Sequence, residues 1–274
     1  MSSDTISAPV RFTEELRVRF GPKREIGRFL LDGDRTLAQM GVRLYVSQDL
    51  RRLYDINRRH LDSWAPLMPV FDPAHAGVRV GPAFLFELQD AKGDVVATQV
   101  TRLLDLGGST LKAELEQLSL FYRDPASQSG RRERIEVTAP MAGEITGRVG
   151  LSGGLWYRSD WRGKGLSQVM PRMTRTFAYT NWDTDYTISF VEQPPIDHGI
   201  LQLYGLPVSQ PWIKIRDSYR PEVDLQLTWR PKAEIASDVA AYQADLNKRR
   251  ERVSEVPDTQ NSPELVRQGK SRRS

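Results

Sequence analysis

The chain has 274 residues, of which 39% are hydrophobic and 27% charged, a composition typical of an ordinary soluble protein rather than a disordered or membrane one. Cysteine is absent, which excludes disulfides, thiolate metal sites and a cysteine nucleophile. No apolar run is long enough to span a bilayer, and "MSSDTISAPVRF" lacks the apolar core of a signal peptide. We therefore expect a cytoplasmic location and no membrane partner.

The formal net charge of +4 and the pI of about 9.3 raise the question of a nucleic-acid partner. The excess lies in residues 246–274, which hold eight Lys and Arg against four Asp and Glu. This composition is typical of a solvated, partly disordered tail. The rest of the chain holds 31 residues of each sign and is neutral. We therefore expect no nucleic-acid partner; binding through the tail is a third, weaker hypothesis.

The first 60 residues predict several elements in chain order. Residues 15–20 fit a short strand, and residues 24–40 a pair of helices broken at Gly33. Residues 42–46, "VRLYV", alternate and fit a strand. Ser47 is the predicted cap of the helix that follows, with Asp49 in its first turn. Apolar side chains then recur on one face of this helix, and arginines occupy its solvent face: Leu50, Leu53, Tyr54, Leu61 and Trp64 against Arg51, Arg52, Arg58 and Arg59.

The middle of the chain predicts a β-hairpin. Residues 65–82 are proline-rich and fit a loop, and residues 83–106 fit two strands joined by a turn at 90–94. A helix near 110–122 and a polar loop at 123–134 follow. Residues 144–159 are strand-like, with a turn or bulge at the glycines between 150 and 154.

The last third predicts a helix, a strand and a closing pair of strands. Apolar residues recur at helical spacing after residue 165, and Pro171 should kink or shorten that helix: Leu166, Val169, Met170, Met173 and Phe177. Residues 185–192 fit a short strand, and a short helix follows two prolines. Residues 212–215 and 223–229 fit strands, and 232–253 a terminal helix. The fold class is therefore α/β with a mixed sheet.

The junction "LWYRSDWRGKGLSQVM" (155–170) passes from a strand to a helix through two glycines and several cations. Gly163 and Gly165 let the backbone bend and a ligand approach, and Ser167 keeps the first turn open. Arg162 and Lys164 add positive charge to the unpaired N–H groups of a helix N-terminus. The junction therefore fits a phosphate or pyrophosphate site, or else simply a basic turn. Neither a Walker loop nor a dinucleotide-binding fingerprint matches its spacing.

The hexapeptide "RGKGLS" resembles the Arg/Gln-x-x-Gly-x-Gly/Ala acetyl-CoA loop of the GCN5-related N-acetyltransferases, with Ser167 in the last small position. Three further segments resemble that family's first strand and helix, its hairpin, and its fifth strand, fourth helix and closing glycine turn: "VRLYVSQDLRRLYDIN", "FLFELQDAKGDVVATQV" and "DYTISFVE…LQLYGLP". The resemblance spans Val42 to Trp229, with an insertion at about 107–140.

This resemblance implies a domain over residues 41–230, with a central twisted mixed sheet and a V-shaped splay between its fourth and fifth strands. Residues 1–40 would be an N-terminal extension, acting as a flap or as a contact in a homodimer. Residues 231–274 would be a C-terminal helix and the basic tail.

The resemblance also implies a cofactor site for acetyl-CoA. Its pyrophosphate would lie on the backbone of the loop residues Arg162, Gly163, Lys164, Gly165, Leu166 and Ser167. Arg162 and Lys164, with Arg172 or Arg175 as further candidates, would reach the outer phosphates. The amide of Tyr157 would polarise the thioester carbonyl, and an amine would attack directly.

The chain departs from the family pattern at the catalytic positions. Leu201 and Pro194 stand where many members carry a Tyr and an Asn. Tyr204, three residues beyond Leu201, is either a packing residue or a substitute acid. Glu192, at the end of the fifth strand, is the preferred base, acting directly or through a water. Asp160, Glu144 and His198 are weaker candidates for proton transfer.

Two hypotheses follow. The first is an acyl-CoA-dependent N-acyltransferase that transfers acetyl from acetyl-CoA to an amine, a small molecule or a protein. The second is an inactive member of the same fold that binds coenzyme A and acts as a sensor or interaction module. The histidines of the chain lack the partners that a metal site needs, so we expect no metal.

Overall fold

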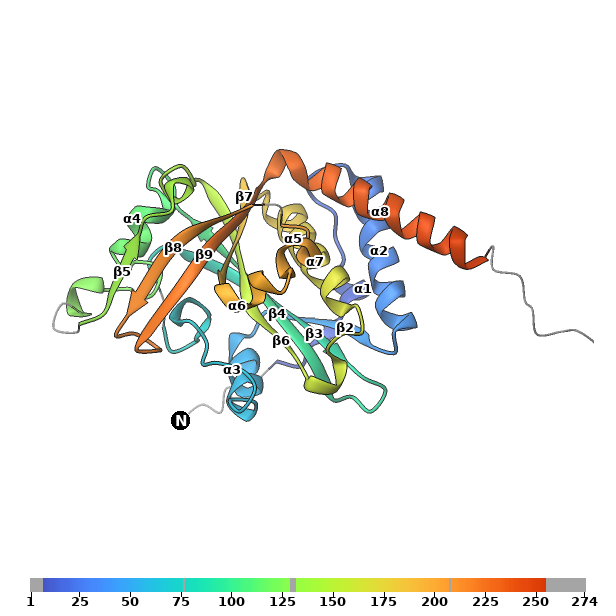
Figure 1. The fold of residues 1–274 in the computed structure, drawn as a ribbon, viewed down its shortest axis with the longest axis horizontal. Helices are drawn as coiled ribbons and strands as arrows, with labels where there is room; N and C mark the ends of the chain where they lie inside the picture. Colours follow the sequence, from blue (N-terminus) through green and yellow to red (C-terminus); the bar gives the residue numbers. More distant parts are fainter. Residues whose placement is uncertain (1–6, 76, 129–131, 207, 255–274) are drawn as a thin grey trace, which may run out of the picture.

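A computed structural model describes residues 7–75, 77–128, 132–206 and 208–254, with side chains up to residue 244 in the last helix. Within these residues one nine-stranded sheet forms the centre of the molecule, in the order β1-β2-β3-β4-β6-β7-β9-β8-β5 (Figure 1). Its strands are β1 (Val10–Arg11), β2 (Arg43–Ser47), β3 (Val80–Gln89), β4 (Val95–Asp105), β5 (Arg134–Val137), β6 (Arg148–Tyr157), β7 (Tyr186–Glu192), β8 (Ser209–Arg216) and β9 (Glu222–Pro231). Neighbouring strands are antiparallel except β6 and β7, which are parallel. The predicted mixed α/β class is confirmed.

Helices cover both faces of this sheet. They are α1 (Phe12–Glu15), α2 (Lys23–Gln39), α3 (Leu50–Arg59), α4 (Leu111–Glu116), α5 (Leu166–Trp182), α6 (Gln193–Asp197), α7 (Ile200–Tyr204) and α8 (Lys232–Ser254). The hairpin β3–β4, the helix α5 and the strands β7, β8 and β9 lie where the sequence predicted them. The part of the predicted tail beyond residue 254 lies outside the described residues.

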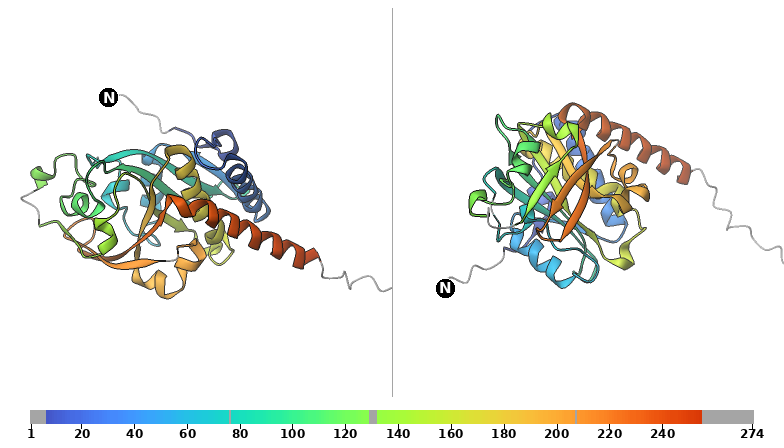
Figure 2. Two further views of the ribbon diagram at one scale, coloured as in Figure 1. Left: turned by 90° about the horizontal axis from the view of Figure 1, so that it is seen from above. Right: turned by 60° about the vertical axis from the view of Figure 1, so that its left-hand side comes forward.

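Each face of the sheet carries its own hydrophobic core. One core lies under α2, α5 and α8 and includes Phe29, Met170 and Phe177. The other lies under α3, α4 and residues 67–71 and includes Phe71 and Phe121. Helix α8 runs beside α2 (Figure 2), where the rings of Tyr242 and Phe29 meet edge to face at 6.0 Å.

The N-terminal 40 residues, predicted as an extension, contribute to the same sheet and core. Strand β1 pairs with β2, and α2 buries Ile26, Phe29 and Leu30 completely or nearly so. Their role as a flap or as a dimer contact stays a prediction.

Two predictions about this N-terminal segment were wrong. Residues 15–20 are not a strand: α1 ends at Glu15, and the chain then passes the end of α5, where Arg19 and Phe20 both donate to the Thr180 carbonyl. The helix α2 is continuous through Gly33. Gly33 serves packing instead, because the absence of a side chain there makes room for Met173 of α5. A Cβ at Gly33 would lie 2.5 Å from the Met173 sulfur.

The helix α3 also differs from its prediction. Its cap is Asp49, which accepts from the Arg51 N–H, while Ser47 accepts from the Asp49 N–H one step earlier. The helix ends at Arg59, so Leu61 and Trp64 lie beyond it. Arg52 is not a solvent-facing arginine: its guanidinium bonds both carboxylate oxygens of Glu87, which is fully buried.

Two elements further along the chain were also misjudged. Strand β5 lies within the segment expected to be an insertion, where no strand was predicted, and it extends the sheet by pairing with β8. Pro171 does not shorten α5, which runs for 17 residues. Proline lacks only one amide donor, and it stands in the second turn of this helix.

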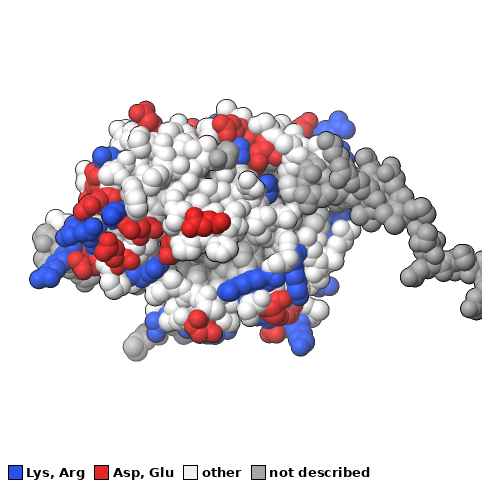
Figure 3. Space-filling model, in the orientation of Figure 1, with Lys and Arg blue, Asp and Glu red and all other residues white. Residues whose placement is uncertain are grey.

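Charged side chains of both signs are interspersed on the face shown in Figure 3, as expected for a neutral body. No described helix is long and apolar enough to cross a membrane.

Candidate active site

The strands β6 and β7 pair for only part of their length. Their parallel ladder joins Val149–Ser152 to Tyr186–Ser189 and then stops. Beyond this point β6 continues to Tyr157 along β4, while β7 continues to Glu192 along β9. The two strands therefore part in a V, which confirms the predicted splay.

Glycines mark the point where β6 leaves its neighbour. The ring of Phe71 lies against Gly153, where a Cβ would approach it to 2.3 Å. The register between β4 and β6 shifts at Gly154, which has a φ of +54°. The predicted bulge is present at this position.

The far half of β6 turns one row of backbone groups toward the gap. Arg158 N–H donates to the Val96 carbonyl on β4, at 2.8 Å. Donors of successive residues alternate between the two edges of a strand. The Tyr157 N–H therefore points to the opposite edge, where β7 has moved away.

A short turn leads from β6 to the N-terminus of α5. After a 3₁₀ turn at Ser159–Trp161, Gly163 and Gly165 take φ values of +73° and +84°, and α5 begins at Leu166. Apart from the two adjacent residues, no atom of the described residues lies within 4 Å of the position of a Cβ on Gly163. The first amides of α5 have no carbonyl ahead of them in the helix, except that Gln168 N–H turns back to Gly165. The turn thus presents backbone donors at the positive end of a helix, with open space beside Gly163.

The charged side chains of Arg162 and Lys164 in this turn are exposed. Arg162 Nε donates to the Tyr157 carbonyl at 3.1 Å, and Lys164 Nζ lies 4.2 Å from the centre of the Trp161 ring. Arg158 is turned away to Asp90 and Asp160.

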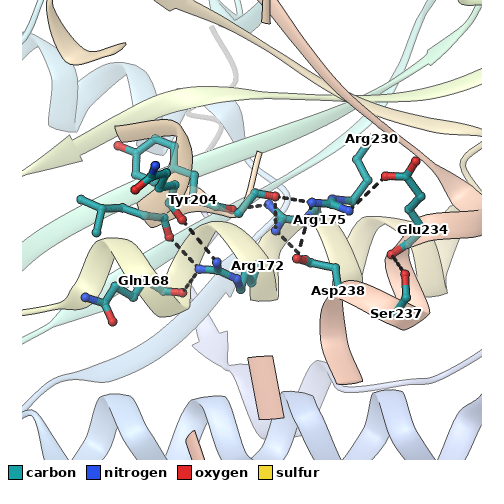
Figure 4. Close-up of polar contacts among 11 residues, drawn as sticks. Gln168, Arg172, Arg175, Tyr204, Arg230, Glu234, Ser237 and Asp238 are labelled. Carbon is teal, nitrogen blue, oxygen red and sulfur yellow. Dashed lines mark hydrogen bonds and ion pairs between the residues drawn. The ribbon is translucent and has the colours of Figure 1, made fainter. Parts of the chain in front are cut away.

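Arg172 and Arg175, the further candidates for the outer phosphates, have other partners in this structure, and their contact with a phosphate stays a prediction. Both donate hydrogen bonds to backbone carbonyls at the end of α7 (Figure 4). Arg172 donates to the Leu203 carbonyl at 2.6 Å, and Arg175 donates to the Tyr204 carbonyl at 2.8 Å. Helix C-termini present unpaired carbonyls, which guanidinium groups satisfy well.

A third arginine from β9 joins this cluster. Arg230 donates to the Gly205 carbonyl at 2.6 Å, and both Arg175 and Arg230 are ion-paired with Asp238 of α8. Gly205 has a φ of +66°, and a Cβ there would lie 2.7 Å from the Arg172 guanidinium. Burial lowers the pKa of Arg175 to about 10, in spite of the Asp238 carboxylate. Figure 4 shows that the Tyr204 ring points away from this cluster.

A cavity of about 560 Å³ fills the V between β6 and β7. Its walls come from both faces of the sheet. Arg162, Pro171, Ile200 and Tyr204 stand on the α5 side, and residues 63–68, Phe71, Tyr219 and Leu225 stand on the α3 side. Between them the cavity is lined by β6 from Ser152 to Tyr157 and by β7 from Ser189 to Glu192.

The three residues proposed for catalysis all line this cavity. The Tyr157 hydroxyl is buried and has no hydrogen-bond partner among the described residues. Burial raises the pKa of Tyr157, with a further rise from the nearby Tyr204. Burial also raises the pKa of Tyr204, so its hydroxyl keeps its proton at neutral pH. Glu192 is ion-paired with Arg220, at 2.6 Å.

The weaker candidates lie outside the cavity. Asp160 is paired with Arg158, Glu144 is exposed, and the exposed His198 ring contacts the Pro194 carbonyl through Nδ1. Sequence reasoning missed Arg220, because nothing in "DSYRPE" indicates that it folds back onto Glu192. The described residues contain no group of three His, Cys, Asp or Glu that could hold a metal ion.

The sequence matches no family model and no curated protein. Several solved structures resemble the chain in three dimensions. One is a spermidine N-acetyltransferase from Vibrio cholerae in complex with CoA and spermine, at 12% identity and a TM-score of 0.37, over 71% of this chain and 98% of that one. Another is RimJ from Mycobacterium smegmatis in complex with CoA-disulfide, at 12% identity and a TM-score of 0.38, over 73% and 88%.

Both of these structures contain coenzyme A, as CoA in the first and as CoA-disulfide in the second. A third is an uncharacterized protein from Bacillus halodurans, at 7% identity and a TM-score of 0.40, over 74% of this chain and 92% of that one. Identities and TM-scores this low describe only a distant similarity in the path of the backbone. The chemistry of the site follows from this chain's own geometry.

Proposed function

We propose that the protein is an acyl-CoA-dependent N-acyltransferase, which transfers acetyl from acetyl-CoA to an amine. One observation supports this most directly. The backbone edge of β6 that β7 leaves free faces a cavity, and the cavity reaches Arg162, the residue that precedes the first glycine of the turn before α5. A strand edge, a cavity and a phosphate-binding turn in this order suit a long ligand with an extended arm and a phosphate group.

The turn from Arg162 to Ser167 would hold the pyrophosphate of coenzyme A. The open space at Gly163 lets a phosphate oxygen approach the backbone, and Arg162 and Lys164 add exposed positive charge beside it. The pantetheine arm would lie along Leu155–Tyr157, whose backbone groups it can pair with. Bound there, acetyl-CoA supplies an activated acyl thioester.

Three residues would then act on the reacting atoms. The Tyr157 N–H donates to the carbonyl oxygen as it gains negative charge, a contribution of about 3 kcal/mol where single donors of this kind have been removed. Glu192, through a water, takes the proton that the amine loses as its nitrogen bonds to the carbonyl carbon. Tyr204 gives its hydroxyl proton to the sulfur as the carbon–sulfur bond breaks.

The test is calorimetric titration of acetyl-CoA into the parent protein and into two variants, Gly163→Asp and Gly163→Asn. Both residues tolerate a positive φ, and no described residue beyond the two neighbours lies within 4 Å of the Cβ position. They differ in charge alone, so Gly163→Asp should bind more weakly than Gly163→Asn by about tenfold, or about 1.4 kcal/mol. If the parent binds no acetyl-CoA, the proposed function is wrong.

One observation favours a second function: the carboxylate of the proposed base, Glu192, is already paired with Arg220. Glu192 accepts from Arg220 through both oxygens, at 2.6 and 3.3 Å, which opposes its use as a proton acceptor. An inactive protein that binds coenzyme A as a sensor or interaction module would keep this pair intact. It would bind acetyl-CoA normally and release no thiol with any amine in a broad panel.

A further inference from the structure

The cavity has a distinct end on the side of the sheet away from α5, here named the acceptor end. It is formed by residues 64–68, Phe71, Phe190, Tyr219 and Leu225. Phe71 and Leu225 are buried in the core on the α3 side, at 3% and 5% exposure. In the proposed function coenzyme A approaches from the N-terminus of α5, so the amine has to enter from the acceptor end.

The walls of the acceptor end are almost entirely apolar. Trp64, Met68 and Phe190 are half-buried and pack on the α3-side core, next to the buried Phe71 and Leu225. Apolar surface of this kind favours a ligand body that can be removed from water at little cost. Burial raises the pKa of the Tyr219 hydroxyl to about 12, so this side chain is uncharged at neutral pH.

The charges of the cavity argue against a ligand with several cations. Among the described residues that line it, Glu192 alone carries a carboxylate. Its two oxygens are held by Arg220. The other charged side chains in the lining, Arg162 and Arg175, are positive. An ammonium group buried without a carboxylate partner loses its hydration with no compensation.

We propose that the acceptor is a small primary monoamine whose single amino group is carried on an apolar body of about the size of an aromatic ring. This inference rests on the proposed function. It excludes polyamines, whose second ammonium group would find no free carboxylate among the described residues that line the cavity. The cavity must hold the pantetheine arm as well, so the apolar body is small.

The experiment compares 2-phenylethylamine with spermidine. Binding of each amine to the full-length protein saturated with CoA is measured by calorimetry, and acetyl transfer from acetyl-CoA is measured by thiol release. We expect 2-phenylethylamine to be preferred over spermidine by at least about tenfold in both measurements, since each tenfold step corresponds to about 1.4 kcal/mol.

A pair of variants tests the reason for this preference. Met68 lies on the loop that walls the acceptor end and is half-exposed. Met68→Glu adds a carboxylate there, and Met68→Gln adds an uncharged side chain of the same shape. Met68→Glu should lower the preference for 2-phenylethylamine by about tenfold, and Met68→Gln should change it much less. Urea unfolding midpoints establish that both variants are folded.

The outcomes separate this inference from the proposed function. Spermidine bound as tightly as 2-phenylethylamine, neither amine bound at millimolar concentration, or an equal effect of Met68→Glu and Met68→Gln would each overturn the inference. If acetyl-CoA binds in those cases, the proposed function survives. Absence of acetyl-CoA binding would remove both.

Discussion

Tyr157 and Tyr204 both line the cavity, but loss of the hydroxyl group should lower kcat only at Tyr204. Tyr157 is proposed to act through its backbone N–H, which Tyr157→Phe leaves in place. Tyr204 is proposed to act through its hydroxyl, which Tyr204→Phe removes. The two substitutions delete the same atom from neighbouring rings, so each is the control for the other.

The role of the Tyr204 hydroxyl and the surroundings of the Tyr157 hydroxyl set the expected changes in kcat and stability. A general acid typically contributes a factor of about 10² to 10⁴, so Tyr204→Phe should lower kcat at least about a hundredfold, or about 2.7 kcal/mol. The Tyr157 hydroxyl is buried with no hydrogen-bond partner among the described residues. Removing an unsatisfied buried hydroxyl relieves a desolvation cost, so Tyr157→Phe should raise the free energy of unfolding by about 1 kcal/mol and keep kcat within about twofold.

Steady-state acetyl transfer with a preferred amine gives kcat, and urea unfolding gives the free energy. Binding of acetyl-CoA, measured by calorimetry, should be unchanged in both variants because neither hydroxyl belongs to the phosphate turn. Equal losses of kcat in the two variants would refute the assignment of the Tyr157 backbone. Full activity of Tyr204→Phe would mean that this side chain only packs.

Two further pairs of substitutions test the fold. Arg52→Met leaves the fully buried Glu87 without its guanidinium partner and should lower the free energy of unfolding by about 3 kcal/mol or more. Adding Glu87→Gln to the same chain should recover part of this loss. A loss below about 1 kcal/mol would place Arg52 on the solvent face after all. Gly33→Ala should cost about 1 kcal/mol net because its Cβ meets Met173, whereas Gly27→Ala, 3.8 Å from its nearest neighbour, should gain about 0.5–1 kcal/mol by helix propensity. Equal urea midpoints for the two alanine variants would show that α2 and α5 do not pack through Gly33.

Local patterns were enough to predict the elements that build the cavity. Alternation predicted the hairpin, and helical spacing predicted α5. The glycines of 150–154 predicted the bulge at which β6 turns away from β7. The glycine turn at 163–165 was visible because positive φ values and an open approach both require residues without a side chain. Features that depend on backbone conformation can therefore be read from neighbouring residues.

The errors have a common cause in contacts between distant segments. Gly33 looked like a helix breaker because its partner Met173 is 140 positions away. Arg52 looked solvent-facing because Glu87 is invisible to the periodicity of α3. Strand β5 was missed because its short run of alternation sits in a polar segment and is stabilised by pairing with β8.

The position of Tyr204 depends on distant residues in the same way. A helix of five residues is too short to hold a catalytic side chain by its own hydrogen bonds. Its last carbonyls are instead fixed by Arg172 and Arg175 from α5, and Arg230 from β9 fixes the carbonyl that follows. Asp238 joins two of these arginines to α8, beyond the segment that resembles the acetyltransferase family. The C-terminal helix is thereby part of what holds the proposed acid at the cavity.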